Sequence, residues 1–216
     1  MKYHLLVLLS LLSSFSFGQT RVENPYSPDR QRGANSVEIN ALPANIDSAV
    51  AALIIGGCVE ISNFQIHGPS DAFGVFLDPT EAIGMSAGVV ITNGEAMIAE
   101  GPDDDDNAGN NQGVGGHQDL TQIAGITTFD ATWIEFDFTP LADTLFASDF
   151  VFGSEEYPEW VNAGYNDVFG FFISGPGIAG PFSNGAENIA WVPGTTTPVA
   201  IDNVNNGQSG SGPCTN

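Results

Sequence analysis

Four polar residues between two apolar runs are the first candidates for chemistry in this sequence. Glu155 and Glu156 follow the run 150–152, and Asn166 and Asp167 precede a second apolar run. Runs rich in Phe and β-branched residues and closed by Gly are typical of core strands. The polar residues between them are then expected on a connection at the rim of a sheet, where binding groups are usually placed. Such residues fit either acid–base catalysis or cation binding.

Catalysis by the adjacent glutamates is the less favoured of these two interpretations. Glu155 and Glu156 resemble the paired carboxylates of a secreted glycoside hydrolase. Adjacent residues in an extended segment point to opposite faces, so both can line one cleft only at a bulge. A catalytic pair must also span about 5–9 Å across a sugar, which sequence neighbours seldom do. We therefore expect no catalytic residues here.

A metal site is the stronger functional hypothesis for the same residues. Either glutamate, with Asn166 and Asp167, could bring several oxygen ligands to one rim. Calcium takes six to eight oxygens, some of them from backbone carbonyls and water. In the alternative interpretation, Asn166 and Asp167 cap turns and the glutamates accept backbone hydrogen bonds. The sequence leaves both interpretations open.

A second acidic segment lies in the Gly- and Asn-rich loop 100–117. Asp103 and Asp105 fit the first and third positions of an EF-hand calcium loop. Ala108 stands where that loop needs Gly, and Val114 stands where it needs Glu. Two hypotheses remain, a looser calcium loop that includes Asp103 and Asp105, and a solvated acidic loop.

The charge balance narrows the class of partner. The chain has 26 acidic and four basic residues, a net charge of −22, and no Lys or Arg follows Arg32. Nucleic acid and anionic membranes are poor partners for a chain with such a negative electrostatic field, because like charges repel. Salt bridges cannot balance the carboxylates, which must be solvated, hydrogen-bonded to backbone N–H groups or neutralised by bound cations. Most of these acids are expected on a solvated surface, and Ca²⁺ is the cofactor expected where a bound cation neutralises them outside the cell.

The first 18 residues have the pattern of a secretory signal peptide. Lys2 precedes the apolar run 5–12, and Ser16 and Gly18 are the small residues before a cut at Gln19. The run is too short to anchor the chain, and no later stretch approaches the roughly 20 apolar residues of a membrane helix. We expect a secreted or surface-attached mature chain without a transmembrane segment.

Cysteine and histidine usage agrees with an exported protein. Cys58 and Cys214 fit an oxidising compartment and could form one long-range disulfide. His67 and His117 have no second His or Cys at zinc spacing.

Two aromatic residues in the polar insert support a different binding hypothesis. Trp160 and Tyr165 could stack on a sugar ring, which would make the chain a carbohydrate-binding module. One or two exposed aromatic side chains are also ordinary on a protein surface.

Short strands between turn signals favour an all-β fold. Residues 43–57 have the apolar spacing of one short N-terminal helix, and residues 119–124 predict a helical turn. The remaining pattern predicts an antiparallel, jelly-roll-like β-sandwich with long acidic loops. Its predicted strands cover 58–66, 72–77, 88–92, 131–138, 144–152, 168–173, 188–192 and 199–204.

One pair of these strands is predicted to be a hairpin. Ala131–Phe138 alternates apolar and polar residues, as a half-buried strand does. Thr144–Phe152 is its expected partner, through the turn residues 140–143.

Several motifs together resemble one known family. They are Phe-Gly-Ser-Glu-Glu-Tyr at 152–157, Tyr-Asn-Asp-Val-Phe-Gly-Phe-Phe at 165–172 and Ser-Gly-Pro-Gly at 174–177. The strand 88–94 and the segments 192–195 and 201–205 extend the match. This combination resembles the choice-of-anchor L domain of exported bacterial surface proteins, mainly from Bacteroidetes.

The resemblance implies a non-catalytic surface module for adhesion, matrix contact or surface display. Residues 1–18 are then the signal peptide, 19–43 a leader or irregular segment, and 44–216 the domain. Family members usually continue with further strands, so the domain is expected to be truncated at its C-terminus, and Cys214 could have its partner beyond it. The expected ligand is an extracellular protein or a glycan.

Overall fold

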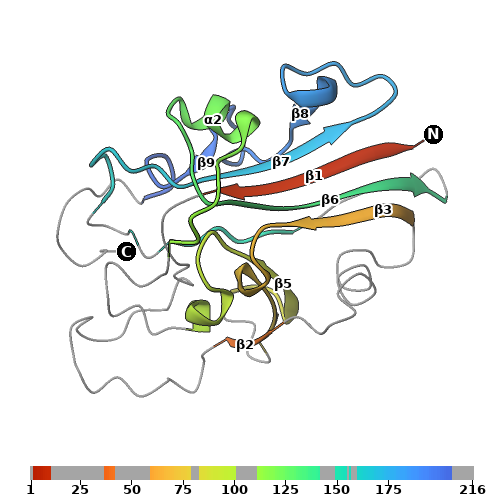
Figure 1. The fold of residues 1–216 in the computed structure, drawn as a ribbon. Helices are drawn as coiled ribbons and strands as arrows, with labels where there is room; N and C mark the ends of the chain where they lie inside the picture. Colours follow the sequence, from red (N-terminus) through yellow and green to blue (C-terminus); the bar gives the residue numbers. More distant parts are fainter. Residues whose placement is uncertain are drawn as a thin grey trace, which may run out of the picture.

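The computed structural model describes residues 2–10, 37–41, 59–78, 83–100, 111–141, 149–154, 156 and 160–205. Within these residues it holds one larger and one smaller antiparallel sheet (Figure 1). The larger sheet has the order β3-β6-β1-β7-β8, with β9 also paired to β7, and the smaller has the order β2-β4-β5. The strands are β1 (Tyr3–Ser10), β2 (Glu38–Ala41), β3 (Val59–His67), β4 (Phe73–Leu77), β5 (Ala87–Ile91), β6 (Ala131–Pro140), β7 (Val168–Ser174), β8 (Glu187–Asn188) and β9 (Val199–Ala200).

The alternation of β6 gives the larger sheet its two faces. Ile134, Phe136 and Phe138 are buried, whereas Trp133 and Glu135 between them are partly exposed. The first set packs with Phe73 of the smaller sheet and with Phe171 of β7 in one core cluster. Each of these large side chains contributes roughly 1.5–3 kcal/mol when fully buried. The two sheets therefore share a hydrophobic core.

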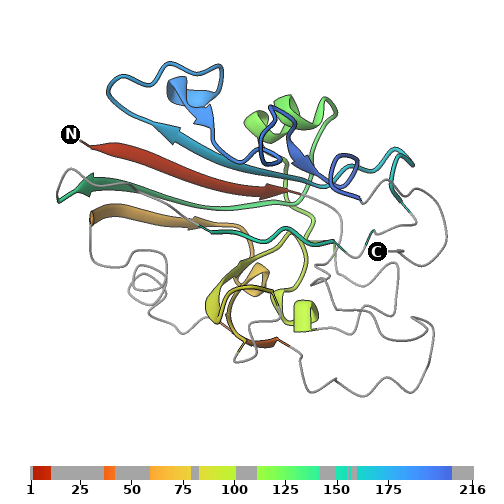
Figure 2. The same ribbon diagram turned by 180° about the vertical axis from the view of Figure 1, so that it is seen from behind.

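The opposite face of the larger sheet is covered by α2 (Gln118–Ala124), which lies above β7 in Figure 1. Leu120 of the helix packs with Phe172 and Ala200, all fully or almost fully buried. The view from behind shows α2 and the β8 and β9 segments on this same face (Figure 2). The larger sheet is thus buried on both faces along β7.

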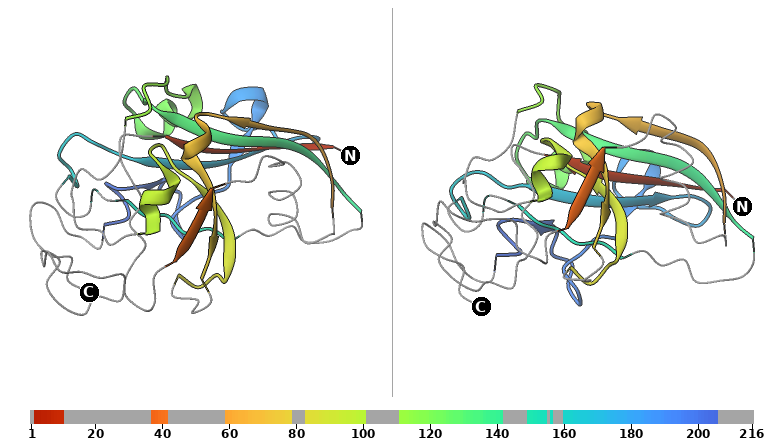
Figure 3. Two further views of the ribbon diagram at one scale, coloured as in Figure 1. Left: turned by 60° about the horizontal axis from the view of Figure 1, so that its bottom comes forward. Right: turned by 90° about the horizontal axis from the view of Figure 1, so that it is seen from below.

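The smaller sheet crosses the larger one at a steep angle (Figure 3). Its inner residues, including Ile39, Phe76 and Val90, form a cluster of their own with η2 (Ala96–Glu100). Glu100 adds a polar contact, since its Oε1 accepts the N–H of Ile39 at 3.0 Å. The edge strand β2 is held through this bond as well as through its pairing with β4.

The all-β prediction is confirmed, because strands dominate and they pair antiparallel. The strands expected at 58–66, 72–77, 88–92, 131–138 and 168–173 appear as β3 to β7, and the helical turn expected at 119–124 appears as α2. The strands expected near 188 and 199 are shorter than predicted. The jelly-roll sandwich order stays a prediction.

The strand predicted at 144–152 is not found where the structure describes this segment. Residues 149–154 form no strand, and Phe150 and Val151 are each 40% exposed. Strand β1, from the predicted signal peptide, lies beside β6 instead of a hairpin partner. Residues 142–148 lie outside the described part of the chain.

Other predictions also lie outside the described residues. These are the helix at 43–57 and both cysteines, Cys58 and Cys214. Within the described residues, no helix has the length and apolar character needed to cross a membrane.

Candidate functional site

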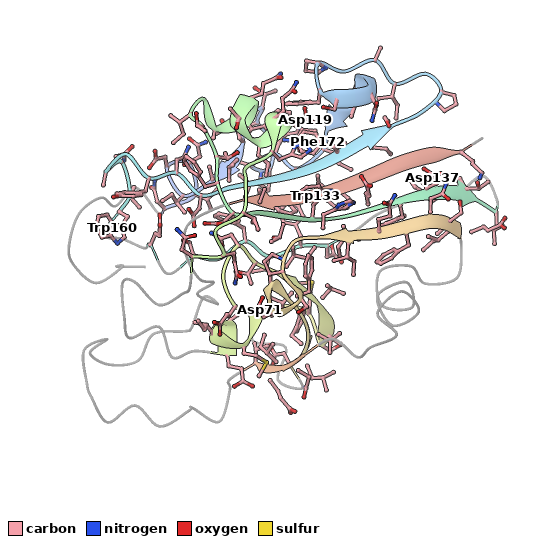
Figure 4. The ribbon with its side chains drawn as sticks, in the orientation of Figure 1. Asp71, Asp119, Trp133, Asp137, Trp160 and Phe172 are labelled. Atoms are coloured by element: carbon pink, nitrogen blue, oxygen red, sulfur yellow. The ribbon has the colours of Figure 1, made fainter. Side chains whose placement is uncertain are left out.

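The described part of the polar insert lies at the end of the larger sheet where β7 begins. Figure 4 places Trp160 at this end, far from Asp137 at the other end. The insert is held by the segment that follows β9. The N–H of Ile201 donates to the backbone oxygen of Asp167 at 3.0 Å, and the N–H of Asp202 donates to Asn166 Oδ1 at 3.2 Å. Asn166 and Asp167 thus directly precede β7, whereas the strand expected before the insert at 150–152 is not found.

One further bond fixes the turn within the insert. The N–H of Asn162 donates to Asp202 Oδ1 at 2.6 Å, and Asn162 has a positive φ of 58°. Asn is one of the few residues that tolerate this backbone region. The turn at 160–164 is thus fixed to the segment after β9 by the side chain of Asp202.

Ser154, Glu156 and Asp167 form a buried polar group beside this turn. Their exposed fractions are 1%, 4% and 6%. The Ser154 hydroxyl donates to Asp167 Oδ2 at 3.4 Å, and Ser154 Oγ accepts the N–H of Glu156 at 3.2 Å. Ser154, which the sequence did not single out, thus joins the carboxylate of Asp167 to the backbone of Glu156, two residues that the sequence predicts as oxygen ligands.

Buried carboxylates need compensation for the solvation that they lose. No Lys or Arg follows Arg32 in the sequence. Hydrogen bonds of the kind that Ser154 makes provide part of the compensation. A bound cation is the other kind of partner that physical chemistry allows.

Trp160 and Tyr165 lie together on the outer side of the insert. Their rings meet edge to face, with centroids 5.0 Å apart at 77°. Tyr165 is 43% exposed, and Trp160 is partly buried. An edge-to-face pair fixes both rings, and it leaves an aromatic surface that a ligand can contact beside the acids.

Only some of the predicted metal ligands lie in the described part of the chain. Glu155, Asp103 and Asp105 lie outside the described residues. Among the residues that the structure does describe, no three or more His, Cys, Asp or Glu side chains are grouped so as to hold a metal ion. Asn166 lies at the same rim as Asp167, but its Oδ1 is engaged by the N–H of Asp202.

A second polar cluster, which the sequence did not predict, lies on the α2 side of the sheet. His67 stacks on Trp133 with ring centroids 4.5 Å apart at 11°, and its Nε2 lies 3.0 Å from Glu135 Oε1. His117 meets the same indole edge to face at 5.3 Å. Burial lowers the pKa of His117, against the opposing effect of the carboxylates of Asp119 and Glu135.

The strand register explains why sequence spacing missed this cluster. His67 and Trp133 face each other across β3 and β6, and the register shifts at an irregularity between Ser62 and Gln65. The spacing of histidines in the sequence therefore did not show the pair that His67 forms with Trp133 across the two strands. The alternation of residues along β6 places Trp133 and Glu135 on one face, and this was the sequence signal from which part of the cluster could have been predicted.

The comparison with known families assigns the whole region. The model of the choice-of-anchor L domain matches residues 38–216, which includes both sheets after β1 and the rim group. The chain belongs to the choice-of-anchor L family. No curated protein and no solved structure matches it. Choice-of-anchor L domains are surface-associated modules of a non-enzymatic type, found in extracellular or surface proteins.

Proposed function

We propose that this choice-of-anchor L domain serves adhesion, matrix contact or surface display outside the cell, with calcium stabilising its rim loops. Its scaffold would be a jelly-roll-like β-sandwich. The mature chain would form when the signal peptide is cleaved. Family membership supports the surface role. The burial of Glu156, only 4% exposed, supports a non-catalytic one, because a general acid or base must reach its substrate.

The observation that carries the calcium proposal is the pair of buried carboxylates at the rim. Ser154 contacts the Asp167 carboxylate and the backbone N–H of Glu156, and both acids are buried in a sequence without Lys or Arg after Arg32. Calcium accepts backbone carbonyls and water alongside carboxylates. The other ligands would come from those sources and from Glu155, with Asp103 and Asp105 as candidates for a second site.

Adhesion of cells that display the full-length protein tests this function. We expect such cells to bind immobilised extracellular matrix in calcium and to lose most of that binding in a calcium chelator. Asp167→Asn should reduce binding at least about tenfold, since it removes a charged ligand (about 1.4 kcal/mol per tenfold). Asp71→Asn, at an exposed aspartate of η1 (Ser70–Ala72), is the matched control and should bind normally.

Each result has a distinct meaning for the proposal. Equal adhesion with and without calcium would refute the calcium part and leave the adhesive role. No adhesion by displayed protein in calcium would refute the adhesive role. Accessibility of the protein to protease on intact cells checks that it is displayed in either case.

A carbohydrate-binding module is the second candidate, and the Trp160–Tyr165 pair favours it. Exposed aromatic rings beside acidic and amide groups are suited to stacking on and hydrogen-bonding to sugars. A glycan array should then show binding that Trp160→Ala and Tyr165→Ala abolish. Phe129→Ala, at an aromatic residue 52% exposed near α2, should leave it unchanged. An array without positive glycans would reject this candidate.

A further inference from the structure

Strand β1 lies in an unusual place for a segment that the sequence predicts to be a cleaved leader. It pairs antiparallel with β6 from Tyr3↔Phe138 to Ser10↔Ala131, and antiparallel with β7 through Ser10↔Val168. Strands β6 and β7 are therefore parallel to each other and joined only through β1. Cleavage before Gln19 would remove the strand in the middle of the larger sheet.

The position of β1 cannot stay empty in the exported protein. Its loss would leave β6 and β7 about 10 Å apart, twice the spacing of paired strands. Both would then carry unpaired backbone N–H and C=O groups next to residues that are now fully buried, such as Ile134 and Phe172. Unpaired buried backbone groups are rare because each costs about as much as a lost hydrogen bond. Either β6 and β7 close directly on each other, or another strand takes this place.

We propose that Asp149–Phe152 takes the place of the end of β1 in the exported, leader-cleaved protein. The strand would run in the direction that β1 has now, antiparallel to both neighbours. Phe150 would replace Leu9, between Thr132 of β6 and Phe169 of β7. The proposal rests on leader cleavage and is independent of calcium binding.

The present contacts of Phe150 support this register. Its ring already lies 4.8 Å from the ring of Phe169, the residue that pairs with Leu9. Ser154, two residues beyond the proposed strand, is bonded to Asp167, which directly precedes β7. The segment is thus held at the end of the larger sheet where β7 begins.

The side chains also fit the two faces of the sheet. In the proposed register, Asp149 replaces Leu8 on the α2 side of the sheet, between the partly exposed Trp133 of β6 and the buried Gly170 of β7. Phe150 would face the core that holds Ile134 and Phe136, with which Phe169 already packs. Since Phe150 and Val151 are each 40% exposed now, their burial would give an additional driving force.

Chain connectivity favours the same arrangement. Consecutive strands are neighbours in about two-thirds of cases, and short hairpins form more easily than distant pairings. Asp149 follows the end of β6 at Pro140 closely in sequence, whereas β1 is more than a hundred residues away. The hairpin predicted from the sequence at 131–152 would then form with β7 as its third, antiparallel strand.

Hydrogen exchange of the exported protein tests the proposal without any mutation. Mass measurement first establishes that the chain begins at Gln19. We expect the amides of Phe150, Val151 and Phe152 to exchange on the order of a thousandfold more slowly than in an unstructured chain, as in a central strand. Exchange at the unstructured rate, or a chain that retains residues 1–18 with β1 protected, would overturn the proposal.

Paired cysteines test the register in a background with Cys58→Ser and Cys214→Ser. The pairs Ala131→Cys with Val151→Cys and Thr132→Cys with Phe150→Cys should form disulfides, because facing residues lie within the 4.4–6.8 Å that a disulfide spans. The pair Ala131→Cys with Val168→Cys should not, since both residues face Ser10 from opposite sides. A disulfide only in this last pair would show that β6 and β7 close directly on each other and would overturn the proposal. If the variants fail to fold, the exchange experiment decides.

Discussion

The ring of His117 caps helix α2 by accepting the backbone N–H of Asp119 on its Nδ1 atom at 3.2 Å. Side-chain acceptors at this position satisfy one of the N–H groups that a helix leaves unpaired at its start. Nδ1 can accept this bond only when the imidazole is neutral. Burial, which lowers the pKa of His117, favours that neutral form.

The first prediction follows from this lowered pKa. The folded protein takes up the proton of His117 at a lower pH than the unfolded chain, whose His titrates near 6.5. The stabilising contribution is complete above pH 6.5 and is lost as the pH falls from there through the folded pKa. Denaturant unfolding between pH 7.5 and about 5 should therefore show a falling free energy of unfolding.

Two variants separate this effect from the titration of the many carboxylates. His117→Asn keeps a good helix cap without a titrating group, so its stability should depend less on pH than that of the wild type. His117→Ala should lose about 1 kcal/mol at pH 7.5. If His117→Asn and the wild type lose stability equally between pH 7 and 5, His117 is not the group responsible.

The second prediction concerns Asp119, which joins α2 to the turn η3 (Ser183–Gly185). Asp119 is 1% exposed, and its Oδ1 accepts the N–H of Ser183 at 3.1 Å and the Ser183 hydroxyl at 2.9 Å. Figure 4 shows Asp119 above Phe172 on this side of the sheet. Asp119→Ala leaves both donors without their acceptor and should cost about 2–4 kcal/mol of unfolding free energy.

The control for this variant is another aspartate at the start of a short helix. Asp71 is exposed, so Asp71→Ala should change the free energy of unfolding by less than about 0.5 kcal/mol. Similar losses for the two variants in urea unfolding would show that the contacts with Ser183 do not stabilise the fold.

The third prediction uses two adjacent glycines before α2. A side chain at Gly116 would overlap the backbone carbonyl of Thr128, whereas a side chain at Gly115 would meet nothing within 4 Å. The close approach of Gly116 lets the N–H of His117 donate to Thr128 Oγ1 at 3.2 Å. Gly116→Ala should cost more than about 2 kcal/mol, because the backbone must shift.

Gly115→Ala is the matched comparison at the neighbouring position. It should be tolerated within about 1 kcal/mol, as expected where the added methyl group has room. Melting of both variants by circular dichroism measures the difference. Equal melting temperatures would contradict the close packing of Gly116 against Thr128.

Local patterns in the sequence predicted the strands in which apolar and polar residues alternate. Ile134, Phe136 and Phe138 recur at every second position of β6, and this period places them on one face whichever strand lies next to β6. The end of α2 is similarly local, since Gly125 adopts the left-handed conformation with a φ of 72° that terminates helices. Features of this kind need no knowledge of the tertiary fold.

The neighbours of β6 could not be predicted in the same way. The run 5–12 is apolar enough to pair with any exposed strand edge, and β1 lies beside β6 where the sequence predicts residues 144–152. Strand pairing between distant segments depends on competition among edges rather than on local propensity. This is also why the pairing of His67 with Trp133 was missed.

The candidate site was predicted in position but not in composition. Apolar runs on both sides of the insert placed Asn166 and Asp167 at a sheet rim, where the structure has them. The contribution of Ser154 was not foreseen, because a serine between Gly153 and Glu155 has no sequence pattern that marks burial. The burial of Glu156 likewise has no sequence pattern that marks it.

Thermal melting of the exported domain tests the proposed binding of calcium at the rim beside Glu156 and Asp167. Saturation at about a hundred times the Kd should add about 2.7 kcal/mol of stability, which raises the melting temperature by about 5–10 °C. Magnesium should have a much smaller effect, and Asp167→Asn should remove most of the rise. A melting temperature that is the same in calcium and in chelator would contradict the claim.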